Sequence, residues 1–316
     1  MMAHARRTQN EAAGVALFED GIDHSLDNQE RRTLWSDAWK RLRRNKLALF
    51  GFFWIVFLII VALSADLWVP RVLGSPTFVD TTMTATMSKT PPSLQHPFGT
   101  DNLGRDELSR IIYGARVSLS VGVVAMSISL LIGLILGISA AYFGGLWDSI
   151  IMRVTDIFMA FPFILLAIAL LAALGPSIMN MFLAIGLIGW TSIARVIRSV
   201  ILQIKENDYV SAARALGASN LRIILRHILP NSIAPVVVYA TMGIGTAIIS
   251  EAALSFLGLG IQPPTASWGL MISDAQQYLT IAPWLVFAPG LAILLTVLSF
   301  TLLGDGLRDA MDVKVN

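Results

Sequence analysis

The side chains that could take part in a reaction are few, and they are not grouped in the sequence. Cysteine is absent from the 316 residues, so the chain offers no thiolate nucleophile. The histidines stand far apart and lack the spacing of metal ligands: His4, His24, His96 and His227. No paired carboxylates and no Ser/His/Asp arrangement are apparent. We therefore expect neither a catalytic residue nor a metal site in this chain.

A site for nucleotide hydrolysis is not indicated either. The phosphate-binding loop G-x-x-x-x-G-K-[ST] places a lysine directly after a glycine, and no lysine here follows a glycine. The net charge of +2 is too small to imply a nucleic-acid partner. We therefore expect a chain that is not an enzyme and binds no cofactor of its own.

The composition indicates that lipid is the main solvent. Hydrophobic residues make up 55% of the chain and charged residues 14%, whereas soluble domains average about 25% charged. A helix needs roughly 20 mostly apolar residues to span a bilayer. Six segments qualify, namely Leu47–Trp68, Val117–Phe143, Ile150–Leu174, Ile178–Ile197, Ala234–Leu259 and Trp284–Leu303. They lack the alternation of barrel strands, so the predicted fold class is an all-α membrane protein with six transmembrane helices.

Single residues within these spans predict local features. Gly133, Gly137 and Ala141 are spaced by four, which lets a second helix approach closely, although glycine is also simply common in membrane helices. Pro162 and Pro289 are expected to kink their helices.

The distribution of lysine and arginine predicts the orientation. A basic cluster at 40–46 precedes the first span, and the segment 198–233 is also basic, whereas 175–177 and 260–283 contain neither residue. The excess of positive charge marks the cytoplasmic side, so both termini are expected there. We divide the chain into a cytoplasmic tail (1–46), a first helix with an outer loop (47–104), and a five-helix core (105–316).

The inner segment between the fourth and fifth spans has the pattern of two short helices. Asp208 suits a helix N-cap, and Gly217 stands where a helix end favours a left-handed residue. Ser219 or Asn220 can cap a second helix, which Pro230 ends. The expected helices are Val210–Leu216 and Leu221–Leu229. Because helices this short are marginal in water, we expect a partner surface to hold them.

This segment, 203–230, resembles the EAA loop of ABC importer permeases. The resemblance runs through Ser211-Ala212-Ala213, Gly217 and His227-Ile228-Leu229-Pro230, with Ser211 in place of the motif's Glu and His227 in place of its Ile. In that family the loop docks in a cleft of the cytoplasmic ATPase and transmits its closure. The implied coupling residues are Asp208, Ser211, Ala212, Ala213, Arg214, Gly217, Arg222, His227, Leu229 and Pro230.

Further segments narrow the resemblance to the dipeptide/oligopeptide/nickel branch, and to its DppC/OppC-type subunit. They are His96–Arg110 with Gly114–Leu119, Phe143–Asp156, Leu254–Pro264 and Gly304–Asp309. The resemblance implies a type I importer permease in the bacterial inner membrane. It also implies a homologous second permease, two ATPase subunits that use ATP and Mg²⁺, and an extracytoplasmic solute-binding protein. Dipeptides or oligopeptides are the solutes that the resemblance favours, and glutathione or a nickel chelate are the alternatives.

Two further site hypotheses remain open at this stage. Glu251 is an acid inside the fifth span, so it either lines the solute pathway or pairs with a partner-subunit group or a backbone amide. Asp101, Arg105 and Asp106 either contact the binding protein or belong to a structural elbow, because 105–119 has helical spacing and could lie along the outer interface. For Asp156 and Arg153, a local ion pair or an interface contact is favoured over a transport role.

Other classes of membrane protein fit the sequence less well. An ion-coupled secondary transporter would need inverted repeats and several embedded acids, and the spans contain one embedded acid and no evident repeat. An intramembrane enzyme would need a nucleophile and a base at a common depth, and neither is apparent. A simple membrane anchor would not need six spans and an ordered inner loop.

Overall fold

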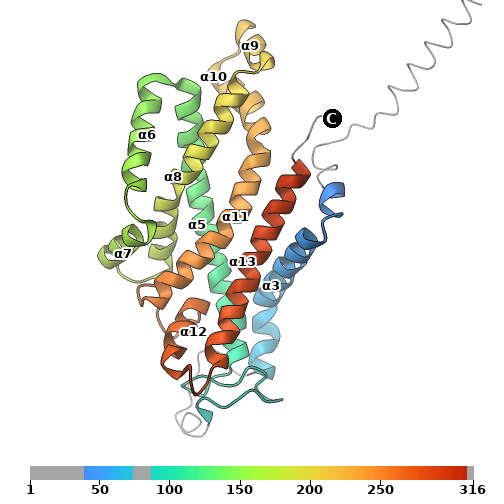
Figure 1. Cartoon of the computed structure of the whole chain (residues 1–316), viewed down its shortest axis with the longest axis vertical. Coiled ribbons are helices and arrows are strands. Elements are labelled where there is room, and N and C mark those ends of the chain that lie inside the picture. Colours follow the sequence, from blue (N-terminus) through green and yellow to red (C-terminus); the bar gives the residue numbers. More distant parts are fainter. Residues whose placement is uncertain (1–38, 74–86, 312–316) are drawn as a thin grey trace, which may run out of the picture.

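The computed structural model describes residues 39–73 and 87–311, and these residues form a helical bundle. They contain no strand beyond one isolated bridge between Thr100 and Asp106. The predicted all-α class is confirmed. Figure 1 shows the long helices side by side: α3 (Lys46–Val72), α5 (Glu107–Phe143), α8 (Ile178–Lys205), α11 (Leu229–Phe256) and α13 (Trp284–Met311).

The third predicted span, Ile150–Leu174, is a bent pair of helices. α6 (Gly145–Met159) and α7 (Phe163–Leu174) meet at 85°, and they are apolar enough to cross a membrane together. The predicted bend at Pro162 is confirmed, but it is a break between two helices and not a kink within one. Pro162 has extended backbone, with φ −58° and ψ 130°, and it directly precedes α7. Because proline lacks an N–H, it suits the start of a new helix better than the interior of a longer one. Pro289, in contrast, lies inside α13, which is one continuous helix.

The N-terminal part of α5 corrects a second expectation. The helix begins at Glu107, where the carboxylate of Asp106 accepts a hydrogen bond from the Ser109 N–H at 2.7 Å. A capped start of this kind satisfies one of the free donors at a helix end. Residues 107–119 are therefore the first turns of α5 itself and do not form a separate interfacial segment.

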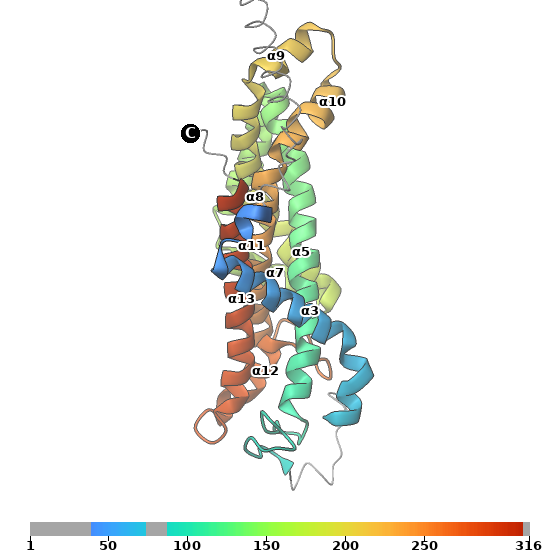
Figure 2. The same ribbon diagram turned by 90° about the vertical axis from the view of Figure 1, so that its right-hand side faces the viewer.

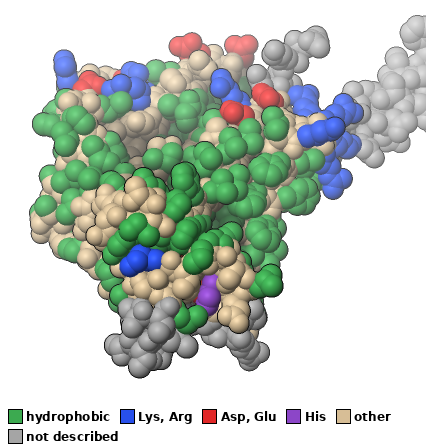
Figure 3. Space-filling model, turned by 60° about the horizontal axis from the view of Figure 1, so that its bottom comes forward, with side chains coloured by type: hydrophobic (Ala, Val, Ile, Leu, Met, Phe, Trp, Pro, Cys, Tyr) green, Lys and Arg blue, Asp and Glu red, His purple; other side chains and the backbone are tan. Residues whose placement is uncertain are grey.

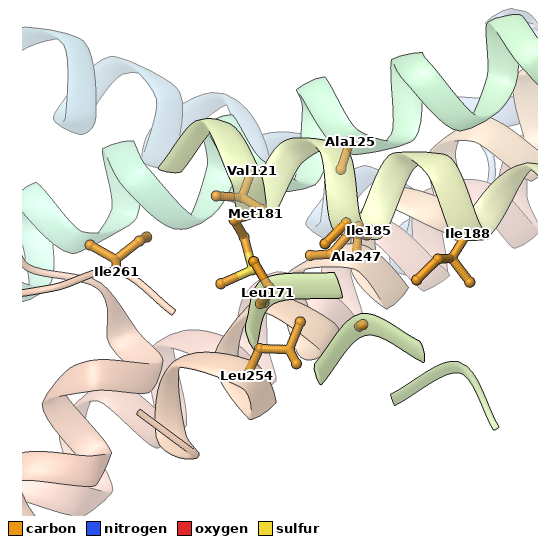
Figure 4. Close-up of a cluster of buried hydrophobic side chains, with 11 residues drawn as sticks. Val121, Ala125, Leu171, Met181, Ile185, Ile188, Ala247, Leu254 and Ile261 are labelled. Carbon is orange, nitrogen blue, oxygen red and sulfur yellow. The ribbon is translucent and has the colours of Figure 1, made fainter. Parts of the chain in front are cut away.

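Glycines set the close approach of α5 and α8. A Cβ added to Gly133 would lie 2.8 Å from the Ile193 side chain, and one added to Gly137 would lie 2.7 Å from the Ala194 carbonyl oxygen. Neither distance leaves room for a methyl group. The close-packing interpretation of this spacing is confirmed. Figure 4 shows the adjoining apolar core, in which Val121 of α5 and Met181 of α8 lie near Leu171 and Leu254.

The bundle has two distinct ends. The segment between α8 and α11 forms what we call the loop end, with α9 (Asp208–Ala215) and α10 (Asn220–Ile223). Residues 87–106, α12 (Trp268–Ala275) and a short 3₁₀ turn (Gln276–Tyr278) lie at the far end. Figure 2 shows α3 crossing the other helices obliquely. In Figure 3, hydrophobic side chains cover the sides of the bundle, and charged ones gather mainly at the edge away from the far end.

Candidate functional site

The first helix of the loop ends in a left-handed turn at Gly217. Its φ is +78°, as the sequence predicts. The turn is closed by two hydrogen bonds: the Gly217 N–H donates to the Arg214 carbonyl at 3.0 Å, and the Ala218 N–H donates to the Ala213 carbonyl at 3.1 Å. Glycine adopts this conformation without the steric cost that a Cβ brings. The N-cap is Asn207, one residue before the predicted Asp208, which instead lies in the first turn, where an acid is favourable.

The second helix is shorter than predicted and continues into the bundle. Ser219 caps it by accepting a hydrogen bond from the Arg222 N–H at 3.4 Å. After α10, a π-helical turn (Ile224–Ile228) runs directly into α11. The prediction that Pro230 ends the helix is therefore wrong. Pro230 lies in the first turn of α11, where the N–H that proline lacks is not required.

The loop has a buried face and an exposed face. Val210, Ile223 and Ile228 are buried and pack with Ile201 of α8. On the opposite face, three leucines are largely exposed, with 88% of Leu216, 66% of Leu221 and 54% of Leu225 accessible. Arg214 and Arg222 are exposed as well. Apolar side chains gathered on a polar surface mark a partner site, so the geometry of this face suits docking.

The remaining predicted coupling residues lie along the same loop. Ser211, Ala212 and Pro230 are exposed, whereas Ala213, His227 and Leu229 are partly buried. The ring of His227 lies 6.3 Å from that of Tyr209, so the π-helical turn contacts α9. The backbone carbonyl of His227 accepts a hydrogen bond from the Asn231 side chain. The sequence motif thus maps to one continuous loop, and its role in coupling stays a prediction.

Glu251 is held within this chain. The residue is 0% exposed, and its carboxylate accepts hydrogen bonds from Ser118 Oγ at 2.9 Å and from Ser255 Oγ at 2.8 Å. Its partners are therefore serine hydroxyls of α5 and α11, which the sequence reasoning did not anticipate. The neighbouring Ser250, not Glu251, lines a groove of about 440 Å³ between α5, α8 and α11. This arrangement favours a structural role for Glu251, because a carboxylate at membrane depth requires hydrogen-bond partners.

We expect Glu251→Gln to leave the uptake ratio of a cationic to a neutral solute unchanged. The amide can still accept a hydrogen bond from one serine and donate to the other. Glu251→Leu should instead lower the free energy of unfolding by about 1–3 kcal/mol, because both buried hydroxyls lose their acceptor. Uptake assays and thermal unfolding of the purified complex measure the two effects. A selective loss of cationic-solute uptake in the Gln variant would indicate that Glu251 lines the solute pathway.

Three charged residues of the far-end loop (residues 87–106) are buried, namely Asp101, Arg105 and Asp106. The Asp101 carboxylate contacts the guanidinium of Arg105 at 2.7 Å and that of Arg110 at 3.4 Å, and it accepts the backbone N–H of Leu103. Asp106 caps α5 and contacts His96 Nδ1 at 2.8 Å. These contacts fold the loop onto the start of α5. The hypothesis that Asp101, Arg105 and Asp106 contact a binding protein stays untested, and their burial favours the structural alternative.

One acid of α12 belongs to the same region. Asp274 lines a small pocket with Asp101, Glu107 and Arg110. Burial raises the pKa of Asp274 above its ordinary value, whereas Arg110 and Arg105 act in the opposite direction. This proximity could not be predicted, because α12 and residues 87–106 are far apart in the sequence.

Two ion pairs tie α6 to α8. Asp148 accepts two hydrogen bonds from Arg198, both at 2.6 Å, and Asp156 pairs with Arg195 at 2.7 Å. Asp156 therefore pairs with an arginine of another helix and not with the neighbouring Arg153. A bidentate pair fixes orientation as well as distance, so these contacts hold α6 in place beside α8.

The arrangement of the helices has the fold of type I ABC importer permeases. The solved inward-facing MetNI methionine ABC transporter matches this structure with a TM-score of 0.54 and 19% sequence identity, over 64% of this chain and 96% of that one. A second crystal form of that transporter matches with a TM-score of 0.53 and 20% identity, over 65% of this chain and 97% of that one. At these identities the likeness concerns the fold alone.

Sequence relatives give the particular family. Residues 133–316 match the family of binding-protein-dependent transport system inner membrane components, and residues 33–92 match the N-terminal TM domain of oligopeptide transport permease C. The dipeptide transport system permease protein DppC of Alkalihalophilus pseudofirmus is 47% identical over 281 residues, which is 89% of this chain and 90% of that protein. The glutathione transport system permease protein GsiD of Escherichia coli is 46% identical over 284 residues, or 90% and 92% of the two chains. The chain belongs to this family of ABC transporter permeases, as its motifs predict.

Proposed function

We propose that this chain forms one half of the membrane pathway of an ATP-driven importer for di- or oligopeptides or a similar small solute. The observation that carries the proposal is the exposed apolar and cationic face of the loop, presented beside the left-handed turn at Gly217. An exposed apolar face outside the membrane is unfavourable in water, so another protein is expected to cover it. Glutathione remains an alternative solute, because relatives of nearly equal identity are named for dipeptide and for glutathione transport. A nickel chelate is a further alternative, which the sequence resemblance implies.

The proposed assembly contains three kinds of partner protein. A homologous second permease completes the pathway, two cytoplasmic ATPase subunits bind the loops of the pair, and an extracytoplasmic binding protein delivers the solute. This chain catalyses no reaction, and ATP with Mg²⁺ is used by the ATPase subunits. The basic cluster at 40–46 lies immediately before and at the start of α3, and α13 ends at Met311. Their placement supports an inner-membrane protein with both termini and the loop in the cytoplasm.

The groove between α5, α8 and α11 is the proposed half of the pathway. It is lined by apolar side chains and by the hydroxyl groups of Ser192, Tyr239, Thr246 and Ser250. None of the described residues that line it is charged. A neutral lining of this kind offers no charged group that could select a solute by its charge, so we assign selection of the solute to the binding protein.

Purification in mild detergent tests the proposal. We expect a second permease and two ATP-binding proteins to accompany this chain, and the reconstituted complex to hydrolyse ATP faster when a binding protein loaded with solute is added. Screening peptides, glutathione and nickel chelates against that binding protein identifies the solute. Solute uptake by this chain in the absence of any ATPase subunit would contradict the proposal.

A further inference from the structure

A hydrogen bond joins the end of α5 to the loop. The hydroxyl of Tyr142 donates to the Asn220 side-chain oxygen at 2.8 Å. Tyr142 lies in the last turn of α5 and is only 6% exposed, and Asn220 is the first residue of α10. The two residues are 78 positions apart in sequence, so the contact belongs to the folded arrangement and not to local structure.

The last residue of α8 binds the same turn of α5. Lys205 Nζ donates to the Tyr142 carbonyl at 2.9 Å and to the Ala141 carbonyl at 3.2 Å. Carbonyl groups at a helix C-terminus lack partners within the helix and carry partial negative charge, so an ammonium group is favourable there. The ends of α5 and α8 are therefore tied to each other, and Tyr142 connects both to the loop.

The three helices that line the groove, α5, α8 and α11, are joined to the loop in different ways. α8 precedes the loop directly in the chain, and α11 follows it through the π-helical turn. α5 has no covalent link to the loop, although it contributes Met126 and Ser129 to the lining of the groove. A displacement of the loop reaches α5 through side-chain contacts, and among the described residues the Tyr142–Asn220 hydrogen bond joins α5 to the segment between α8 and α11.

We infer that Tyr142 is a positioning residue that makes α5 follow the loop when the ATPase moves it. The inference rests on the proposed function, because it assumes that the loop transmits closure of the ATPase. Tyr142 belongs to the same buried apolar cluster as Ile201 and Ile223, and this packing survives loss of the hydroxyl. Tyr142→Phe therefore removes the directional link and leaves the packing in place.

The test measures solute transported per ATP hydrolysed by the reconstituted complex. Tyr142→Phe and Asn220→Ala are each expected to lower this ratio by about fivefold, the factor that corresponds to one ordinary hydrogen bond. The double variant should be no worse than either single one, because both remove the same link. Asn220→Asp keeps an acceptor oxygen for the Tyr142 hydroxyl, so this variant should have the wild-type transport ratio. A purely structural role of Tyr142 would not require this recovery.

Tyr113→Phe is the matched control. Its hydroxyl donates to Asp66 at 2.8 Å, near the far end of the bundle, so the variant loses a hydrogen bond of equal length away from the loop. We expect an unchanged transport ratio in this control. An unchanged ratio in Tyr142→Phe, or additive losses in the double variant, would overturn the linkage while leaving ATP-driven transport intact. A wild-type complex without ATP-driven transport would overturn the proposed function, and the linkage with it.

Discussion

Replacing Asp101 with alanine is expected to lower the free energy of unfolding by about 3–5 kcal/mol, the usual cost of removing one partner from a buried ion pair. The Asp101 carboxylate contacts both Arg105 and Arg110, and all three side chains are buried. The substitution also removes the acceptor of the Leu103 and Arg105 backbone N–H groups. Thermal unfolding of the purified complex in detergent measures the loss.

Asp66→Ala is the control for this prediction. The Asp66–Arg116 pair has a similar length of 3.0 Å, but the carboxylate side chain is 64% exposed. Because water screens an exposed pair, its loss should have little effect on stability. Equal changes in the unfolding temperature of the two variants would contradict the structural role assigned to Asp101.

The second large effect concerns transport. Gly217→Val places a β-branched residue at a φ of +78°, where an L-residue costs roughly 1–2 kcal/mol. No atom lies within 4 Å of an added Cβ, so the substitution strains the backbone without a steric clash. We expect ATP-driven uptake to fall by about tenfold or more, the factor that corresponds to 1.4 kcal/mol. Gly217→Asn should retain most of the activity, because asparagine tolerates this conformation.

Gly175→Val separates backbone strain from coupling. Gly175 has a φ of +86° and also has no atom within 4 Å of an added Cβ, but it lies between α7 and α8, away from the loop. Uptake assays on membranes containing equal amounts of each complex should show a much smaller loss in this variant. Comparable losses in the two valine variants would indicate a general effect on folding.

Local features of the fold could be predicted from the sequence. The start of α3 and the end of α7 follow from where apolar runs begin and stop, and the turn at Gly217 follows from the residues around it. The break before α7 was expected only as a kink, because the composition is apolar on both sides of Pro162. The continuation of the loop into α11 was missed as well, since a proline in the first turn of a helix resembles one that ends the preceding helix.

Contacts between distant residues could not be predicted. Glu251 was recognised as an embedded acid, but its partner Ser118 lies 133 positions away on another helix. The charges of Asp101 and Arg105 were evident, whereas their burial depends on how residues 87–106 fold over the start of α5. The pair of Asp148 with Arg198 and the bond of Tyr142 to Asn220 similarly arise only when the helices pack.

Accessibility of the loop tests the central claim most directly. The chain has no cysteine, so Leu216→Cys introduces a single thiol at the exposed turn, and Leu94→Cys introduces one at the far end. In intact cells, a membrane-impermeant maleimide should label Cys at position 94 but not at position 216. In the assembled complex, a short bifunctional reagent should cross-link the thiol at 216 to an ATPase subunit. Labelling of position 216 from outside the cell would contradict the account.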